Sequence, residues 1–266
     1  MNRGMLFVSF GTSHEETRIK TIDAIEAKVR ATFPDCTPYS AWTSSMLIRK
    51  VAKRGEHHDT LAQALERMTA DGVDDLIVST TCLLRGCEMA KIEAAVNDWS
   101  EQHSVPALIA DPLLASSSDC AKVAKILCDE YSFIPDDAAL LLMGHGSLDT
   151  SNDAYVQIQN EMHAQGRSRF FVATMEGAPT FDDACQQIQA CGALKVYLAP
   201  LMIVAGDHAK RDLAGEDEFS WASRLRACGY EVEPVLKGLG EFQGIQKLVC
   251  DHVDTTLLVR EVLLRG

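Results

Sequence analysis

Short apolar runs alternate with longer amphipathic segments along this chain, which predicts parallel strands joined by crossover helices. The runs typical of buried strands are residues 5–10, 75–84, 139–145, 169–175 and 195–204, with 106–110 as a weaker one. Between them, residues 16–33 and 60–72 carry apolar side chains at helical spacing, and the second segment closes on Gly72, a helix C-cap signal. The pattern therefore predicts an α/β fold.

The two halves of the chain resemble each other at three places. Residues 9–13, SFGTS, match GHGS at 144–147, which sets Phe10 opposite His145. LLRGCEMAK (83–91) matches IVAGDHAK (203–210), and AWTSSM (41–46) matches ATMEGAP (173–179). Because the matches keep the same order at similar separations, we expect two similar Rossmann-like halves, each a parallel sheet flanked by helices, with a cleft between them.

The boundary between the halves is expected near residues 131–139, YSFIPDDAA, where a proline and two acidic residues separate a helix from a strand. We therefore predict an N-terminal half over residues 1–133 and a C-terminal half over residues 134–266. The last helix is expected to be free to pack back on the N-terminal half.

The matched positions differ in chemistry, because the C-terminal half has His145, Glu176 and His208 where the first half has aromatic, hydroxyl and carboxylate side chains. Two neutral imidazoles and one carboxylate suit a divalent first-row metal such as cobalt, nickel, iron or zinc. Ligands of open α/β sheets bind at the carboxyl ends of the strands, where these residues are expected. The flanking glycines would keep the His145 ring uncovered, and a histidine can also accept a proton.

Structural roles compete with these interpretations. A histidine at a strand end more often serves the core, and Glu176 could simply favour the dipole of the helix after it. A glycine-rich loop with a histidine could also belong to a phosphotransferase, but such a site needs nearby arginines. The nearest arginine in sequence is Arg167, whereas Asp149 and Asp153 are acidic, which disfavours phosphate chemistry.

Composition narrows the class of protein. The net charge of -13 argues against nucleic acid and anionic membranes as partners, since both need a basic surface. No apolar run approaches the roughly 20 residues of a membrane span, and the start carries no signal-peptide pattern, so we expect a cytoplasmic protein. The nine cysteines include no CxxC pair, which favours reduced thiols.

Several longer stretches carry a resemblance to a known family. They are VSFGTSHEET, AWTSSMLIRK, LLMGHGS, ATMEGAPTFDD, LAPLMIVAGDHAKRDLAGEDEFSW and GLGE (238–241), in register over essentially the whole chain. The sequence resembles the anaerobic cobalt chelatases of the CbiK type, class II tetrapyrrole chelatases that insert Co2+ into sirohydrochlorin during cobalamin biosynthesis.

The resemblance implies a bilobal fold with the tetrapyrrole in the interdomain cleft. It makes His145 a metal ligand and proton acceptor, with Glu176 and His208 as the other metal-binding residues. The divalent metal, Co2+ first, is a substrate, and no organic cofactor is implied. The residues expected to bind the tetrapyrrole are Phe10, Thr12, Ser13, Trp42, Thr43, Met46, Cys82, Leu84, Arg85 and Glu88.

Two features of the expected tetrapyrrole site follow from its ligand. Four of those residues would form a hydrophobic wall against the macrocycle: Phe10, Trp42, Met46 and Leu84. Because sirohydrochlorin is a polycarboxylate and the chain is acidic, cations must line the site. The candidates are Arg49, Lys50, Arg54, Arg85, Lys91, Lys210 and Arg211.

One residue departs from the family pattern, since Cys82 stands where histidine is frequent, and a thiolate is a softer ligand than an imidazole. Nickel or iron could replace cobalt as the metal. A non-catalytic tetrapyrrole or metal carrier would use the same ligands without turnover, and a histidine phosphotransferase is the remaining alternative. A homo-oligomer is possible on this sequence.

Overall fold

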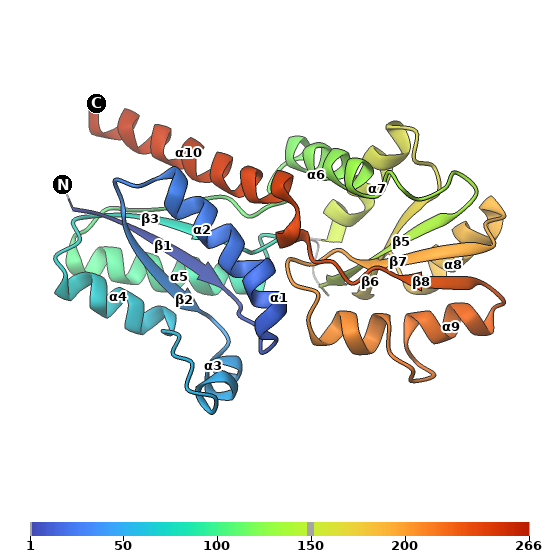
Figure 1. Cartoon of the computed structure of the whole chain (residues 1–266). Helices are drawn as coiled ribbons and strands as arrows, with labels where there is room; N and C mark the ends of the chain where they lie inside the picture. The colour runs from blue at the N-terminus through green and yellow to red at the C-terminus, as the bar shows by residue number, and fades with distance from the viewer. Residues whose placement is uncertain (1, 148–151, 266) are drawn as a thin grey trace. The chain divides into compact units, whose positions relative to one another are not determined.

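The computed structural model describes residues 2–147 and 152–265, with no account of the side chains from 263 onward. The chain forms two compact units, one of Met1–Ala115 with Gln246–Gly266 and one of Ser116–Ile245 (Figure 1). Each unit is an α/β domain with a four-stranded sheet.

The first unit begins with β1 and ends with most of the C-terminal helix. Its elements are β1 (Arg3–Ser9), α1 (Glu15–Lys20), α2 (Ile22–Thr32), β2 (Thr37–Trp42), α3 (Ser45–Ala52), α4 (Leu61–Ala70), β3 (Asp75–Thr80), α5 (Cys87–His103), β4 (Ala107–Ile109) and α10 (Gln243–Arg265).

The second unit repeats the alternation of strands and helices. Its elements are α6 (Ser117–Glu130), β5 (Ala139–Gly146), α7 (Asp153–Ala164), β6 (Phe170–Glu176), α8 (Phe181–Cys191), β7 (Lys195–Pro200), the π-helix η2 (Ala209–Leu213), α9 (Trp221–Ala227), β8 (Glu231–Pro234) and the short 3-10 helix η3 (Leu239–Glu241).

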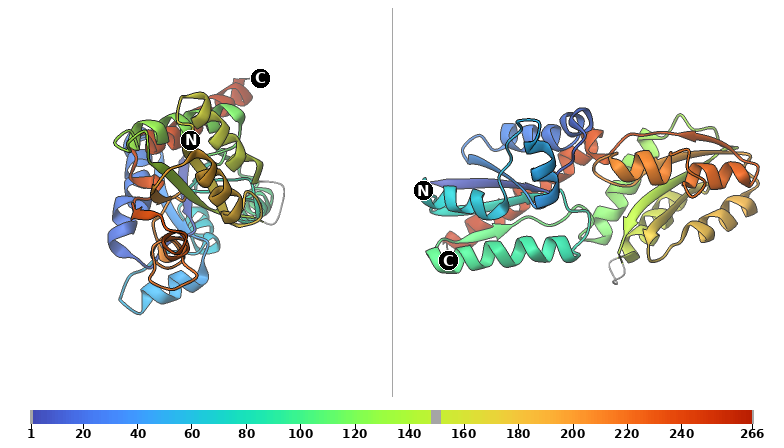
Figure 2. Two further views of the ribbon diagram at one scale, coloured as in Figure 1. Left: turned by 90° about the vertical axis from the view of Figure 1, so that its right-hand side faces the viewer. Right: turned by 90° about the horizontal axis from the view of Figure 1, so that it is seen from below.

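The two sheets have the same topology. The first has the order β2-β1-β3-β4 and the second β6-β5-β7-β8, and every neighbouring pair is parallel. Helices cover both faces of each sheet (Figure 2), which explains why the central strands are apolar throughout rather than alternating. The prediction of two similar α/β halves is confirmed.

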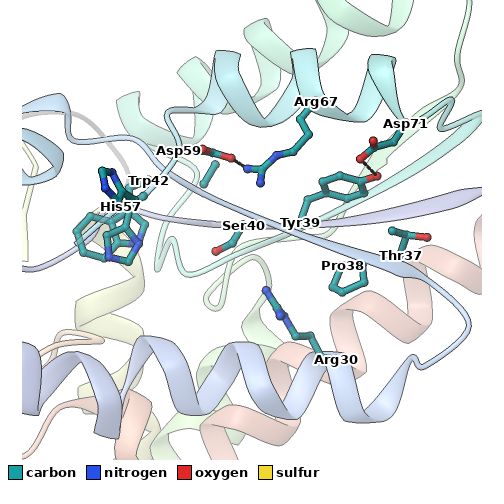
Figure 3. A pocket seen from close by; sticks show the side chains of 12 residues that line it. Arg30, Thr37, Pro38, Tyr39, Ser40, Trp42, His57, Asp59, Arg67 and Asp71 are labelled. Atoms are coloured by element: carbon teal, nitrogen blue, oxygen red, sulfur yellow. Dashed lines mark hydrogen bonds and ion pairs between the residues drawn. The ribbon is translucent and has the colours of Figure 1, made fainter. Parts of the chain in front are cut away.

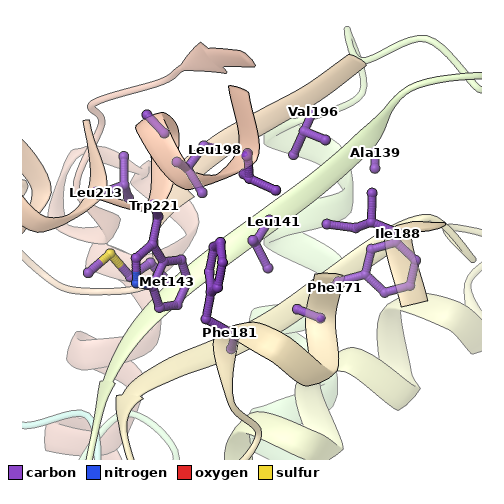
Figure 4. Packing of buried hydrophobic residues seen from close by; sticks show 14 of the residues in the cluster. Ala139, Leu141, Met143, Phe171, Phe181, Ile188, Val196, Leu198, Leu213 and Trp221 are labelled. Atoms are coloured by element: carbon purple, nitrogen blue, oxygen red, sulfur yellow. The ribbon is translucent and has the colours of Figure 1, made fainter. Parts of the chain in front are cut away.

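The core of the second unit lies on the face of its sheet that α8 and α9 cover. Leu141 and Met143 of β5 pack there with Phe171 of β6, Phe181 of α8 and Trp221 of α9 (Figure 4). Alternate β5 residues point to the opposite face, so Leu140 and Leu142 are buried there. This two-sided burial holds β5, the strand that carries His145, in the interior of its sheet.

α10 belongs to the core of the first unit. Figure 1 shows it in red beside α2, where Thr32 Oγ1 donates to Cys250 Sγ at 3.6 Å. Farther along, Arg260 Nε lies 2.7 Å from Asp75 Oδ1, and Arg3 Nε lies 2.6 Å from the other oxygen of that buried carboxylate. Pairing on both oxygens offsets the cost of burying the Asp75 charge.

The compact units do not divide at the predicted boundary between residues 133 and 134. α6 belongs to the second unit, and the segment after it is packed, with Tyr131 and Ile134 buried. A proline and two acidic residues there mark a turn inside the unit. The cleft expected between the halves stays a prediction.

Local differences from the predicted elements follow from side-chain chemistry. The helix expected over residues 16–33 breaks at Thr21, whose hydroxyl donates to the carbonyl of Thr17 at 2.6 Å while its backbone leaves helical geometry. β2 and β8 were not expected, because Pro38 and Pro234 lie within them; both strands stand at sheet edges, where proline is tolerated. β3 and β7 end at Thr80 and Pro200, earlier than the apolar runs suggest.

None of the helices, over the residues that the structure describes, is both long enough and apolar enough to cross a bilayer.

Candidate active site

His145 and His208 lie together at the carboxyl end of the second sheet. His145 stands near the end of β5, and His208 follows the neighbouring strand β7. The chain crosses from β5 to β6 on one side and from β7 to β8 on the other, so the ends of β5 and β7 form the switch point at which open α/β sheets bind ligands. The two imidazole rings are 5.2 Å apart between centroids and nearly perpendicular, at 87°.

The two glycines beside His145 are both required by their surroundings. A Cβ on Gly144 would come within 3.0 Å of the buried Tyr155 ring. Gly146 has a φ of 78°, and a Cβ there would come within 3.0 Å of the backbone oxygen of Glu176. The two glycines thus allow the end of β5 to pack closely against Tyr155 and Glu176. The imidazole between them stays exposed.

Asn152 joins the two loops beside His145. Its amide accepts from the backbone N–H of Ser147 at 2.8 Å, and donates to the carbonyls of Ser147 at 2.7 Å and Glu176 at 3.0 Å. Glu176 also pairs in register with Gly146 across β5 and β6. These contacts fix the backbone of Glu176 one strand away from His145, with its side chain exposed.

Each imidazole has its Nδ1 hydrogen-bonded to an oxygen. Nδ1 of His145 lies 3.2 Å from the carbonyl of Gly146, and Nδ1 of His208 lies 2.6 Å from Oδ2 of Asp212. A carbonyl and a carboxylate only accept, so Nδ1 is the donor in both rings. The Nε2 lone pair of each neutral ring is then available, the arrangement that metal-binding histidines commonly have.

A π-helix supports this arrangement. His208 stands immediately before η2, a single wide turn of the kind that is frequent at functional sites. His208 and Asp212 are four residues apart, which brings their side chains to one face of the turn. Asp212 is not among the residues predicted from the motifs, although a carboxylate four residues after a candidate ligand is a readable signal.

The loop that leads to His208 rests on the GLGE motif. Leu239 N donates to the carbonyl of Met202 at 2.8 Å, and Gly240 N donates to that of Ile203 at 3.0 Å. A Cβ on Gly238 would come within 3.0 Å of the Ile203 carbonyl oxygen. The motif therefore acts as a backbone support for the segment after β7.

The third expected ligand does not join the pair. Over residues 2–147 and 152–265, no three His, Cys, Asp or Glu side chains gather as a set that could hold a metal ion. Glu176 is exposed on the next strand, so its role as a metal-binding residue stays a prediction, as do the metal-binding roles of the two histidines.

Only some side chains of the expected hydrophobic wall in the first unit are exposed to a ligand. Phe10 and Met46 are 54% and 62% exposed, and Leu84 is half-buried. Trp42 is only 2% exposed, because its indole packs beside Leu47 and stacks on His58 with centroids 3.6 Å apart. Its ring therefore supports the end of β2, and its contact with the tetrapyrrole stays a prediction.

The polar residues expected beside that wall hold the loop after β1. Thr12 and Ser13 are buried, and Thr12 Oγ1 accepts from the backbone N–H of His14 at 3.2 Å. Thr43 N donates to the carbonyl of Ser9 at 2.9 Å. The backbone contact of Thr43 ties the ends of β1 and β2 together.

The segment after β3 contains ion pairs and a half-buried thiol. Arg85 pairs with Glu93 and Asp111, and Glu88 lies 3.4 Å from Lys91 Nζ. Burial raises the pKa of the Cys82 thiol, which disfavours its thiolate form. A substrate carboxylate would have to compete for Arg85.

The remaining cation candidates are distributed over both units. Arg54 pairs with Glu56 at 2.9 Å, whereas Arg49, Lys50, Lys210 and Arg211 are exposed. Their contacts to a ligand stay predictions.

A cavity also lies in the first unit, and neither His145 nor His208 lines it. It measures about 460 Å3 and follows the outer edge of β2 in the first unit (Figure 3). Arg30 reaches toward Ser40 from α2, while Arg67 pairs with Asp59 and Tyr39 donates to Asp71 at 2.9 Å. Arginine and aspartate side chains both line this cavity, together with His57 and His58, so it presents no single charge to a ligand.

Comparison with known proteins identifies the family. The family model described as "Cobalt chelatase (CbiK)" matches residues 3–258. The sirohydrochlorin cobaltochelatase of Salmonella typhimurium is 34% identical over 258 residues, 97% of each chain. The sirohydrochlorin cobaltochelatase CbiKC of Nitratidesulfovibrio vulgaris is 29% identical over 253 residues, which are 94% of this chain and 89% of that one.

Solved structures agree on the fold. SirB from Bacillus subtilis with Fe3+ superposes with a TM-score of 0.68 at 13% identity, covering 96% of each chain. The sirohydrochlorin chelatase SirB from B. subtilis subspecies spizizenii in complex with cobalt gives 0.66 at 12% identity, covering 96% of this chain and 95% of that one. With the family model matching nearly the whole length, this chain belongs to the CbiK cobalt chelatase family.

Proposed function

We propose that this protein is a sirohydrochlorin cobaltochelatase, which inserts Co2+ into sirohydrochlorin with release of two pyrrole protons in cobalamin biosynthesis. The observation that carries the proposal is the imidazole pair at the switch point of the second sheet, with both Nδ1 atoms donating to oxygens. The curated relatives with this activity support it over nearly the full chain.

In the proposed reaction, His145 and His208 hold the incoming Co2+ through Nε2. Asp212 keeps the His208 ring oriented and increases its basicity, since its carboxylate accepts from Nδ1 at 2.6 Å. Glu176 is proposed as the further metal-binding residue. A ligand imidazole must be neutral, so His145 can accept a pyrrole proton once the ion has moved to the macrocycle.

The tetrapyrrole is the proposed small-molecule partner, and the metal is a substrate. Cobalt is preferred because the curated relatives are named for it, yet two imidazoles would also accept Ni2+ or Fe2+, whose affinities lie close to that of Co2+. The identity of the ion is therefore part of the test.

The test is anaerobic insertion of Co2+ into sirohydrochlorin, followed by the absorbance change of the macrocycle, with Ni2+ and Fe2+ in parallel. We expect His145→Ala and His208→Ala, each with unchanged circular dichroism, to lower the rate by about 100-fold or more. Wild-type binding of the tetrapyrrole without acceleration would make the protein a carrier. Full activity in both variants would move the chemistry to other residues.

A further inference from the structure

A small pocket lies beside Glu176 in the second unit, and the proposed reaction leaves it unused. It measures about 210 Å3 and is lined by Thr174, Met175, Gly177, Thr180, Phe181, Asp182, Trp221 and Arg224. Met175 and Gly177 flank Glu176 in the sequence, and Glu176 pairs with Gly146 beside His145. The pocket thus opens at the same end of the sheet as the imidazole pair.

Arg224 is the one basic side chain among these lining residues. Its Nη2 donates to Oδ1 of Asp182 at 2.7 Å, and its side chain is 40% exposed. Its guanidinium carbon lies 4.0 Å from the centroid of the Phe181 ring, so the planar head rests on an aromatic face.

The aromatic face beneath Arg224 is rigid. The rings of Phe181 and Trp221 lie 4.9 Å apart between centroids, and both are buried against Met143 of β5 (Figure 4). Thr180 and Asp183 form a capping box that fixes the start of α8, the helix that carries Phe181. The guanidinium therefore has a fixed orientation before any ligand arrives.

The chemistry of the pocket suits a carboxylate. A guanidinium has five N–H donors in a planar fork that matches a carboxylate, and the structure gives one of them a partner, Asp182, among the residues it describes. The volume is below the roughly 300 Å3 at which pockets enclose a whole small molecule. It therefore has room for one carboxyalkyl arm of a larger ligand.

We propose that Arg224 binds one peripheral carboxylate of the tetrapyrrole and so sets the rotation of the macrocycle over the imidazole pair. This inference rests on the proposed function and adds the residue that selects a carboxylated macrocycle. Asp182 competes with the substrate for the guanidinium, because both offer a carboxylate to the same fork. Arg224 acts in binding and takes no part in proton or metal transfer.

The test measures KM and kcat for sirohydrochlorin at saturating Co2+, with Kd for the metal-free tetrapyrrole by fluorescence. We expect Arg224→Gln to raise KM and Kd about 10-fold or more and leave kcat within about 2-fold, because the interaction precedes the chemistry. Arg224→Lys keeps the charge and loses the planar fork, so its KM and Kd should lie between those of wild type and those of Arg224→Gln. Arg226→Gln on the same helix is the matched control and should match wild type.

Asp182→Asn separates binding from a structural role of the ion pair. If the guanidinium anchors the substrate, removing its competitor leaves KM unchanged or lowers it. A KM raised as much by Asp182→Asn as by Arg224→Gln would overturn the inference, because the pair would then serve only the fold. Unchanged KM and Kd in both Arg224 variants, with an active wild type, would overturn the inference alone. A wild type that neither binds nor metallates sirohydrochlorin would overturn the proposed function as well.

Discussion

The two units share one topology but end their central strands differently. β1 is followed by the apolar Phe10, and β5 carries the imidazole of His145 between its last two glycines. The edge strands differ too. In the second unit α7 covers the edge of β6, where Gln159 Oε1 accepts from Val172 N at 2.8 Å, whereas a cavity follows the edge of β2. A common scaffold therefore positions residues, and the chemistry depends on the few side chains at the strand ends.

Substitution of the glycine at the end of each central strand gives the largest expected difference in stability between the units. Gly11 and Gly146 both have positive φ, of 90° and 78°. A Cβ on Gly146 would meet the backbone of Glu176, which cannot move without breaking the sheet edge, whereas a Cβ on Gly11 would meet the side chain of Trp42. We expect Gly146→Ala to lower the free energy of unfolding by about 3 kcal/mol or more, and Gly11→Ala by less.

Urea denaturation of the two variants measures this difference. Gly229→Ala is the control, since Gly229 has a φ of 91° and open space around it, and should cost about 1 kcal/mol. Equal losses for Gly146→Ala and Gly229→Ala would show that the close approach of Glu176 is unimportant.

The second-largest expected effect is on Co2+ affinity, and it comes from Asp212, the partner of His208. At the matched position of the first unit Glu88 pairs with Lys91, whereas His208 donates to the carboxylate of Asp212. Asp212→Asn would remove the charge that orients and strengthens the imidazole, so we expect Co2+ affinity to fall about 10-fold to 100-fold. Isothermal titration with Co2+ measures it, with Glu216→Gln, an exposed carboxylate of the following loop, as the control. Equal affinity in both variants would show that the Asp212 carboxylate does not strengthen Co2+ binding through His208.

The covered edge of β6 gives a smaller effect on stability. Gln159→Leu keeps the bulk of the side chain but leaves the Val172 N–H without its acceptor, and Gln159 also donates to Gln187 at 2.8 Å. A lost acceptor of this kind costs about 1–3 kcal/mol. Chemical denaturation should show that loss, and hydrogen exchange should show faster exchange at Val172. No change in either would mean that water replaces the amide at no cost.

The smallest effect is a pH dependence confined to the first unit. Burial, with the charge of Arg18 adding to it, lowers the pKa of His58, while Glu56 and Asp23 oppose the shift. The unfolded chain, with an ordinary histidine pKa near 6.5, then binds the proton more readily than the folded chain. This contribution to stability is complete above pH 6.5 and is lost as pH falls through that value.

Urea midpoints at pH 7.5 and 5.5 test the dependence. Wild type should lose more stability over that interval than His58→Gln, which keeps a planar polar group beside Trp42. An identical loss in both proteins would assign the pH dependence to other groups.

Much of the architecture could be predicted because strands of a covered parallel sheet are apolar over their whole length. β1, β5 and β7 are read directly from such runs, whereas β2 and β8 lie at sheet edges and contain proline, so they carry little signal. The division at residues 133 and 134 was drawn from local turn chemistry, which cannot tell a packed connection from a linker.

For the site, the sequence by itself determined which residues could bind a metal and that His145 and His208 each stand at the end of an apolar run, because residue types and apolar runs are local properties. Tertiary structure alone decided what those residues touch. It buried Trp42 against His58, occupied Arg85 with Glu93 and Asp111, and gave His208 the carboxylate of Asp212. It also set Arg224 on the Phe181 ring. Most of these contacts join segments far apart in the chain, and such distances are fixed only when the core has packed.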